Sequence, residues 1–413
     1  MSGRRPLRKR KVRGRSLVGE RYTVRADRVA HGGFVVARHE GVVVFVRHAL
    51  PGEQVLVEVT EGRDGDRFLR ADAVQVLESS PGRVEPPCPW AGPGRCGGCD
   101  FQHVALPAQR ALKAAVVAEQ LQRLAGLSVD VEVEAVPGDH DGLGWRTRMQ
   151  WSVAPDGTPG LRRHRSHEVM PVDRCLIAHP GLPDVVGSRW PDASSVESIV
   201  SAGGEQLRLV TSRDGASFAD GPLALHEEAV GRPWRVTGSG FWQVHPGAAD
   251  ALVPAVLEGL SPQRDERALD LYAGVGLFAA ALAAAVGPAG HVLAVESDQV
   301  AAADATANLG DLPQVAVLRE RVDRVFDGSA VRAADVVVLD PPRTGARRSV
   351  VAGVAGLSPR AVAYVACDPA ALARDVAFFA EHGYALGSVR AFDLFPMTHH
   401  VECVAVLARH LVS

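Results

Sequence analysis

From residue 264 onward, short apolar runs alternate with alanine-rich segments, and this alternation limits the possible folds more than any other feature. The apolar runs read "RALDLY", "HVLAVE", "VAVL", "DVVVLD", "AVAYVAC" and, near the end, "HVECVAVLA". Strands that alternate with helices pair in parallel, because each crossover helix packs back onto a face of the sheet. The pattern therefore predicts a doubly wound α/β domain whose sheet is predominantly parallel.

The first part of the chain differs, with short β-rich runs between residues 21 and 77. Gly41, "LPGE" and "GRDGD" interrupt these runs, which predicts a small barrel of about five strands. Its core, "GVVVFVRHALPGEQV", resembles a TRAM domain, which is an RNA-binding module. A helix is expected over 107–125 with Gly126 as its end, followed by a strand-rich segment over 128–235.

These changes along the chain predict its domains and its location. We expect a disordered basic arm (1–15), a barrel (16–80), a middle domain (81–235) and the α/β domain (236–413), with helix 107–125 packed on the last. The arm holds eight basic and no acidic residues, which suits phosphate contacts or simple solvation. The net charge is -3, and no apolar stretch resembles a signal peptide or a membrane span, so we expect a cytoplasmic protein.

A basic hairpin is expected in the middle domain. The stretch "GWRTRMQWSVAPDGTPGLRRHRSHEVMPV" predicts two strands that turn at "DGTPG". Basic side chains alternate with apolar ones along it, at Arg146, Arg148, Arg162, Arg163 and Arg165. The alternation predicts either a nucleic-acid-binding surface beside Trp145 and Trp151 or a solvated face without a ligand.

The stretch "LDLYAGVGLF" predicts a nucleoside site in the α/β domain. It places Asp270, Gly274 and Gly276 at a turn from strand to helix, where glycine lets a ligand approach the backbone. Glu296 ends the next strand, where a carboxylate can hold ribose hydroxyls. These residues suit a nicotinamide cofactor as well as S-adenosylmethionine. The later "VVVLDPPRTG" favours S-adenosylmethionine, and Arg343 replaces the aromatic residue that amine methylation would favour.

Four of the six cysteines form a candidate metal site. "CPWAGPGRCGGCD" spaces Cys88, Cys96 and Cys99 as C-x7-C-x2-C, and Cys175 of "VDRCLIAHP" is a candidate fourth ligand. In a reducing compartment, such a set indicates a metal site instead of disulfides. The spacing alone favours tetrahedral zinc over iron-sulfur and does not decide between them.

A fifth cysteine, Cys367, lies in "YVACDPAALARD" between an apolar run and the start of a helix. Asp368 suits the N-cap and Pro369 the first helical position, so the thiol is expected at a tight turn. A helix N-terminus lowers the pKa of a thiol, whereas an adjacent ionised carboxylate raises it. Cys403 is expected to face the opposite way from Glu402 and to serve packing.

Several motifs together resemble one family, the iron-sulfur-containing RNA 5-methyluridine methyltransferases, which join a TRAM domain to a class I methyltransferase domain. The resemblance covers nearly the whole chain after residue 15. It rests on "CPWAGPGRCGGCDFQ", "FWQVHPGAAD", "LDLYAGVGLF", "VVLDPPRTG", "YVACDPAALARD" and "FDLFPMTHHVECV", in the order of the family. Two departures are Asp368, where the family usually has asparagine, and the longer gap between Cys88 and Cys96.

The resemblance implies an enzyme that methylates carbon 5 of a uridine in structured RNA, ribosomal or transfer, using S-adenosylmethionine and a covalent cysteine adduct. It implies Cys367 as the nucleophile and Glu402 as the base. It also implies cofactor contacts from Gln243, Tyr272, Glu296 and Asp340, and a [4Fe-4S] cluster on Cys88, Cys96, Cys99 and Cys175.

Two alternatives belong to other functional classes. One is a non-enzymatic RNA-binding scaffold whose middle domain is held together by a metal and whose cofactor domain has lost its activity. The other is a nicotinamide-dependent oxidoreductase. The scaffold leaves Cys367 and Glu402 without roles, and the oxidoreductase leaves "DPPRTG" and Cys367 unexplained. We expect a monomer that has no membrane partner.

Overall fold

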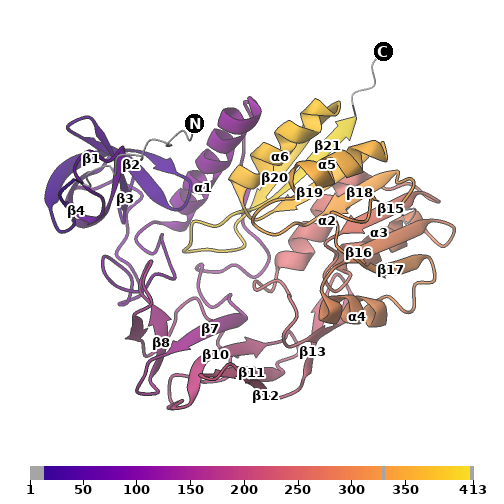
Figure 1. Ribbon diagram of the computed structural model, residues 1–413, viewed down its shortest axis with the longest axis horizontal. Coiled ribbons are helices and arrows are strands. Elements are labelled where there is room, and N and C mark those ends of the chain that lie inside the picture. The colour runs from indigo at the N-terminus through magenta and orange to yellow at the C-terminus, as the bar shows by residue number, and fades with distance from the viewer. Residues whose placement is uncertain (1–13, 328–330, 410–413) are drawn as a thin grey trace, which may run out of the picture. The chain divides into compact units, whose positions relative to one another are not determined.

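The computed structural model describes residues 14–327 and 331–409 (Figure 1). The chain divides into two compact units at the bond between Pro86 and Pro87. The expected basic arm lies outside the described residues, apart from its last two positions. Within the described ranges, no helix combines the length and the apolar character that crossing a membrane requires.

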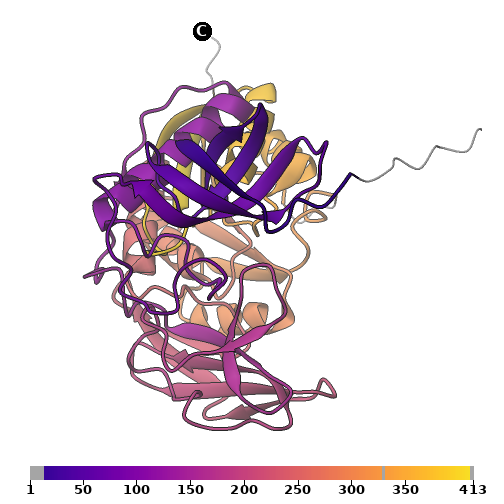
Figure 2. The same cartoon turned by 90° about the vertical axis from the view of Figure 1, so that its left-hand side faces the viewer.

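The first unit is a closed five-stranded barrel, as predicted. Its strands are β1 (Arg21–Ala30), β2 (Phe34–His39), β3 (Val42–Arg47), β4 (Gln54–Glu61) and β5 (Phe68–Glu78), in the order β1-β2-β3-β5-β4. Figure 2 shows this barrel in indigo. Alternate residues of a strand point to opposite faces, so Val44, Val46, Val55 and Val57 fill the interior. Closure of the sheet removes its free edges.

A buried carboxylate fixes the segment that leaves the barrel. Glu53 is fully buried and accepts hydrogen bonds from the backbone N–H groups of Leu50 (2.8 Å) and Ser80 (3.0 Å). The Arg83 guanidinium donates to the same carboxylate at 2.6 Å. Burial by itself raises the pKa of Glu53, but these donors outweigh it and hold that pKa below its ordinary value. The ionised carboxylate thereby ties Ser80 and Arg83 to the barrel.

The middle segment forms a six-stranded sheet of order β12-β11-β10-β7-β8-β9 and a separate hairpin, β13-β14. The strands are β7 (Arg148–Val153), β8 (Pro159–Arg162), β9 (Val169–Pro171), β10 (Ala193–Val200), β11 (Gln206–Ser212), β12 (Ser217–Asp220), β13 (Ala224–Ala229) and β14 (Arg232–Thr237). The β7-β8 hairpin turns at "DGTPG" as predicted. It pairs at only two positions, Ser152 with Gly160 and Val153 with Pro159, and β7 pairs with β10 on its other side.

Part of the expected basic face of this hairpin packs inward instead. Trp145 and Trp151 are 3% and 6% exposed and lie in apolar clusters, so the prediction that they flank a surface is wrong. Arg146 and Arg148 are also withdrawn from solvent, and burial lowers the pKa of both guanidiniums. Arg148 donates to the carbonyl of Gly238 at 3.0 Å. Alternation identifies residues that share a face, but it does not say which face is buried.

The C-terminal part contains an eight-stranded sheet of order β17-β16-β15-β18-β19-β21-β20-β6. The strands are β6 (Val133–Glu134), β15 (Arg267–Leu271), β16 (His291–Glu296), β17 (Val315–Arg319), β18 (Val336–Leu339), β19 (Ala361–Ala366), β20 (Tyr384–Phe392) and β21 (Glu402–Arg409). Strands β15 to β19 pair in parallel, and β21 runs antiparallel to both of its neighbours. The prediction of a predominantly parallel sheet is confirmed.

Helices cover both faces of this sheet (Figure 1). They are α1 (Leu106–Gln120) with a π-helical turn η1 (Leu121–Ala125), α2 (Ala248–Leu260), α3 (Leu277–Val286), α4 (Gln299–Asn308), α5 (Arg347–Gly356) and α6 (Pro369–Glu381). Val336 and Val338 of β18 pack with α2, α3 and α4, whereas Val337 and Leu339 pack with α1, α5 and α6. Successive strand residues therefore enter two cores, as a doubly wound sheet requires.

Candidate active site

Cys367 and Glu402 meet at the ends of neighbouring strands. Cys367 directly follows β19, and Ala366, the last residue of β19, pairs with Cys403 of antiparallel β21. Extending this register by one residue places position 367 beside position 402. Glu402 is 3% exposed, whereas Cys367 is half-buried, so part of Cys367 is open to solvent.

The turn after Cys367 has the predicted helix cap. The Asp368 carboxylate accepts a hydrogen bond from the backbone N–H of Ala371 at 2.7 Å, and Pro369 begins α6. Asp368 thus satisfies an N–H group that has no partner within the helix. The N-cap prediction is confirmed.

The Cys367 thiol is harder to ionise than a free cysteine. Burial, followed by the nearby Glu402 and Asp340 carboxylates, raises the pKa of Cys367 to about 12, and Arg343 opposes this effect. The sequence drew attention to Asp368 and to the helix N-terminus as the main influences. In the fold, burial and two carboxylates from other strands have the larger effect, because only the fold brings them near the thiol.

The two carboxyl groups beside the thiol hold protons more tightly than exposed acids. Burial raises the pKa of Asp340 to about 7. Burial and the neighbouring Asp340 raise the pKa of Glu402 well above its ordinary range, against the effect of Arg343. When ionised, an acid with a raised pKa is a stronger base. Glu402 therefore has the burial and charge environment of a general base.

Two further groups at this site were not assigned roles from the sequence. Arg343 of "DPPR" is exposed, and its guanidinium nitrogen lies 3.4 Å from the ring nitrogen Nε2 of His400. Burial is the main cause that lowers the pKa of His400 to about 3, so this ring is neutral near pH 7. The paired histidines in "THHVE" were the available signal for this arrangement.

The glycine-rich turn after β15 lies against the carboxylate of Glu296. The backbone N–H of Gly274 donates to Glu296 at 2.9 Å, and the N–H of Asp298 donates at 2.7 Å. Gly274 (φ 55°) and Gly276 (φ 97°) adopt backbone conformations that favour glycine. A Cβ on Gly274 would meet nothing within 4 Å, so there is open space beside this turn. The turn and the carboxylate together suit the ribose of a nucleoside.

Tyr272, Asp270 and Asp340 surround the same strand ends. Tyr272 follows β15 and Asp340 follows β18, and the last residues of these two strands pair with each other. Burial raises the pKa of Tyr272 to about 12. Asp270 is fully buried within β15, and its burial raises its pKa to about 8. An acid of this kind remains largely protonated at pH 7 and can donate a hydrogen bond.

Gln243, the remaining cofactor candidate, has a different position. It lines a cavity of about 330 Å³ together with Thr147, Glu227 and Trp242. Tyr272, Glu296 and Asp340 do not line this cavity. The structure therefore gathers three of the four cofactor candidates at the carboxyl edge of the sheet and places Gln243 in the loop before α2.

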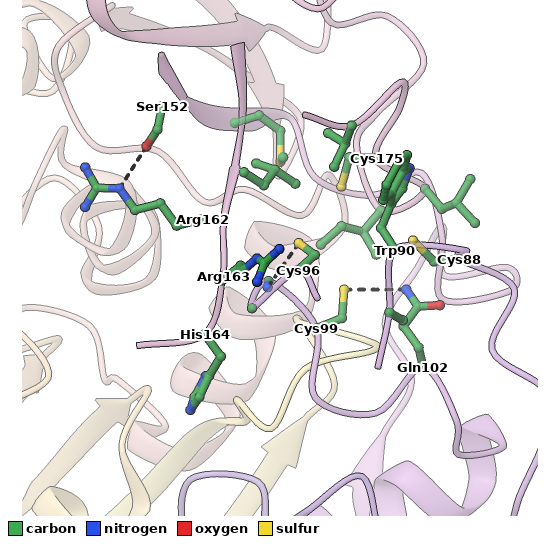
Figure 3. Close-up of a pocket in the computed structure, with 18 of the residues that line it drawn as sticks. Cys88, Trp90, Cys96, Cys99, Gln102, Ser152, Arg162, Arg163, His164 and Cys175 are labelled. Carbon is green, nitrogen blue, oxygen red and sulfur yellow. Dashed lines mark hydrogen bonds between the residues drawn. The ribbon is translucent and has the colours of Figure 1, made fainter. Parts of the chain in front are cut away.

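The four cysteines of the candidate metal site line one cavity. Cys88, Cys96, Cys99 and Cys175 border a space of about 630 Å³, and Figure 3 shows their sulfur atoms turned toward it. Burial raises the pKa of the Cys99 thiol, and the other three cysteines raise it further, against a hydrogen bond from Gln102. Among the described residues, the structure forms no group of three or more His, Cys, Asp or Glu side chains that could hold a metal ion.

Basic side chains border the same cavity. Arg162 and Arg163 are exposed, and Arg162 donates to the Ser152 hydroxyl at 2.9 Å, as Figure 3 shows. Arg163 lies 3.4 Å from Glu168. Arg165 is exposed and lines the cavity as well. Unlike Arg146 and Arg148, these three guanidiniums extend from the surface of the hairpin.

The strand order, the glycine turn and the carboxylate at the end of β16 define a class I S-adenosylmethionine-dependent methyltransferase domain. Residues 15–74 match the TRAM domain, and residues 234–410 match the family described as tRNA (Uracil-5-)-methyltransferase. An RNA methyltransferase of Streptomyces avermitilis, whose function is uncharacterized, is 49% identical over 94% of this chain and 98% of its own length. The chain therefore belongs to the RNA methyltransferases, and it contains matches to a TRAM domain and to the tRNA (Uracil-5-)-methyltransferase family.

Two further comparisons agree. An uncharacterized RNA methyltransferase of Streptomyces coelicolor is 49% identical over 95% of this chain and 93% of its own. The crystal structure of Pyrococcus abyssi tRNA (uracil-54, C5)-methyltransferase with S-adenosyl-L-homocysteine has a TM-score of 0.69, covers 94% of this chain and 100% of that chain, and is 21% identical. This likeness shows a shared fold. Family membership favours methyl transfer over both the scaffold and the oxidoreductase.

Proposed function

We propose that this protein uses S-adenosylmethionine to methylate carbon 5 of a uridine in structured RNA through a covalent adduct with Cys367. The observation that carries the proposal is the register of β19 and β21, which brings the half-buried Cys367 beside the buried Glu402 carboxylate. Both lie at the carboxyl edge of a methyltransferase sheet, where doubly wound domains bind their ligands.

Each residue answers a requirement of the chemistry. Carbon 5 of uridine is a poor nucleophile, and the Cys367 thiolate activates it by forming a sulfur–carbon bond at carbon 6. The electron pair released to carbon 5 would then form the new bond to the methyl group, while the bond between that methyl group and the sulfonium sulfur of the donor would break and leave its electron pair on sulfur. Glu402 removes the remaining hydrogen of carbon 5 as a proton, and the electron pair of that bond expels the Cys367 thiolate. The base must leave its stack to reach the site, so a flipped or looped uridine is the expected substrate.

S-adenosylmethionine supplies the electrophilic methyl group when it is bound. Glu296 is placed to hold the ribose, because its carboxylate lies on the glycine turn. Tyr272 and Asp340, which directly follow the neighbouring strands β15 and β18, border the same edge. Gln243 is the fourth proposed contact. The open space at Gly274 gives a ligand room to approach the backbone.

The environment of the thiol leads to a prediction about pH. Because the pKa of Cys367 is about 12, the thiolate fraction in the free protein should be small at pH 7 and rise about tenfold per pH unit up to pH 10. Alkylation of Cys367 by iodoacetamide, followed by mass spectrometry of its peptide, should show this rise.

Asp340 (pKa about 7) is ionised at pH 9, so Asp340→Asn should lower the pKa of the Cys367 thiol and speed its alkylation. The exposed Asp327→Asn should have no effect. Alkylation that levels off near pH 8 would contradict the raised pKa.

We further propose that the four-cysteine cavity holds a [4Fe-4S] cluster with a structural role. All four cysteines line one cavity of about 630 Å³, although as they stand in the structure they do not form a metal-binding group. Such a cluster takes four cysteine ligands. The proposed methyl transfer involves no oxidation or reduction, so the reaction chemistry does not need the cluster. Cys99 and Cys175 also pack with Trp145 and Ile177, so a cluster there would join two parts of the apolar core.

Metal analysis tests this assignment. Protein purified without oxygen should be brown and contain about four iron and four sulfide per chain. The Cys99→Ser variant should lose most of the iron. The Cys403→Ser variant should retain the iron, because Cys403 is buried in a different part of the apolar core. Stoichiometric zinc with little iron in the native protein would contradict the cluster.

The exposed arginines of the hairpin are proposed to contact RNA phosphates. Replacing Arg162, Arg163 and Arg165 by glutamine should weaken RNA binding and reduce the slope of log K against log salt by about one unit for each lost contact. Filter binding to bulk RNA at several salt concentrations measures that slope. An exposed arginine of another region, Arg324, provides the control variant. An unchanged slope in the triple variant would assign these arginines to a solvated face.

Nucleoside analysis tests the function itself. Bulk RNA from a strain that lacks this protein should contain less 5-methyluridine than the parent RNA. Incubating that RNA with the purified protein and S-adenosylmethionine should restore the modified nucleoside. Mapping the restored position identifies the RNA as ribosomal or transfer. If neither the deletion nor the incubation changes 5-methyluridine, the proposed function is wrong.

A further inference from the structure

The connection between β20 and β21 ends at Glu402. It spans residues 393–401, and Phe392 before it pairs with Glu402 after it. Within this connection, the Thr398 hydroxyl donates to the carbonyl of Phe395 at 2.7 Å and accepts from the N–H of His400 at 3.2 Å. Thr398 is 4% exposed. The buried Thr398 hydroxyl therefore links two parts of the turn that leads into the proposed base, and the backbone N–H of Thr398 also donates to the Phe395 carbonyl, at 3.2 Å.

Helix α1 holds the same turn from outside. The Gln109 side-chain oxygen accepts from the N–H of Met397 at 2.8 Å, and its nitrogen donates to the carbonyls of Val104 (2.8 Å) and Phe101 (3.1 Å). Gln109 is fully buried. Gln109 and Met397 are 288 positions apart in the sequence, and the Gln109 amide thus joins the segment before α1 to the turn before β21.

A buried charge adds to this support. Lys113, one helical turn after Gln109, donates to the carbonyl of Phe395 at 3.0 Å and to Asp393 at 2.5 Å. Lys113 and Asp393 are 1% and 0% exposed. Burying an ion pair is costly, and apolar residues of similar size often stabilise a fold as well or better. The buried ion pair and the Gln109 amide therefore contribute less to stability than to specificity. They hold the turn in one geometry, which apolar side chains at these positions would not specify.

We infer that Gln109 and Thr398 are positioning residues for Glu402, an inference that rests on the proposed function. Both fix the backbone of the turn, and neither belongs to the proposed catalytic pair. Strand register decides which side chains face a site, so a displaced turn would move the Glu402 carboxylate relative to Cys367. A displacement of about 1 Å at a reacting group costs about a hundredfold in rate. The affected step is proton removal from carbon 5, after the adduct has formed.

The test compares Thr398→Val and Gln109→Leu with wild type, using bulk RNA from a strain that lacks the protein. Thr398→Val keeps the shape of the side chain and removes both hydrogen bonds, and Thr398→Ser restores them. We expect kcat to fall about a hundredfold in Thr398→Val and Gln109→Leu, with KM for RNA nearly unchanged. Covalent protein–RNA adduct should accumulate on a denaturing gel, and Thr398→Ser should restore turnover. The control, Gln122→Leu, alters an exposed glutamine of η1 and should behave as wild type.

The outcomes separate this inference from the proposed function. Slow turnover of the folded variants without adduct accumulation would indicate a general structural role and overturn the inference. If Gln109→Leu does not fold, Thr398→Val decides. If Glu402→Gln accumulates adduct and Thr398→Val does not, only the positioning role fails. If wild type neither methylates the RNA nor forms an adduct with RNA that contains 5-fluorouridine, the proposed function fails and the inference fails with it.

Discussion

Replacing Cys367 with alanine should abolish methylation, with a loss of about 10⁴-fold or more, because the variant lacks the thiol that adds to carbon 6. The same variant should form no covalent protein–RNA species. Transfer of a labelled methyl group to RNA measures the first effect, and a denaturing gel measures the second. Binding of RNA and S-adenosylmethionine should persist, because the thiol makes a bond that forms only during the reaction.

Cys403→Ala provides the matched control. Cys403 neighbours Glu402 in sequence, but its side chain is fully buried in the core that also holds Tyr364 and Leu372. The variant should retain nearly full activity at a modest cost in stability. A Cys367→Ala protein that still forms the adduct would refute the nucleophile assignment.

Glu402→Gln should have a different effect, because the amide cannot accept the proton of carbon 5. Addition of Cys367 and methylation of carbon 5 should still proceed, while elimination slows by about 10²- to 10⁴-fold. The methylated adduct should therefore accumulate with ordinary RNA and survive a denaturing gel. A time course with equal amounts of protein and RNA would show rapid formation of the adduct and slow release.

The control for this variant is Glu381→Gln, which alters an exposed carboxylate paired with Arg348 at the end of α6. It should turn over as wild type does. Normal turnover by Glu402→Gln would remove the assignment of the base while leaving Cys367 as the nucleophile. Loss of both adduct and product would instead indicate that Glu402 is needed before carbon 6 is attacked.

Most of the sheet and the barrel could be predicted from the sequence, because their strands are short apolar runs bounded by turn residues. Strand β20 was not recognised, since "YALGSVRAF" mixes small, polar and charged residues and its middle is exposed. Hydrogen bonding to β21 makes this segment a strand although its sequence pattern does not predict one. The burial of Trp145 and Arg146 was not predicted either, because alternation does not reveal which face packs inward.

The candidate site was predictable where local chemistry determines it. Asp368 and Pro369 mark the start of α6, and the position of Cys367 follows from them. The charges around the thiol were not predictable, because Asp340 and Glu402 reach it from other strands. The contact between Lys113 and Asp393 joins residues 280 positions apart, and no local sequence pattern predicts it.

The most direct test uses RNA that contains 5-fluorouridine, because fluorine cannot leave carbon 5 as a cation and the adduct is trapped. Wild-type protein should be incubated with this RNA and S-adenosylmethionine, digested, and mapped by mass spectrometry. We predict that the peptide containing Cys367 carries a nucleotide with both the fluorine and the added methyl group. The absence of an adduct, or an adduct on any other residue, would contradict the proposal that Cys367 activates a uridine for methylation.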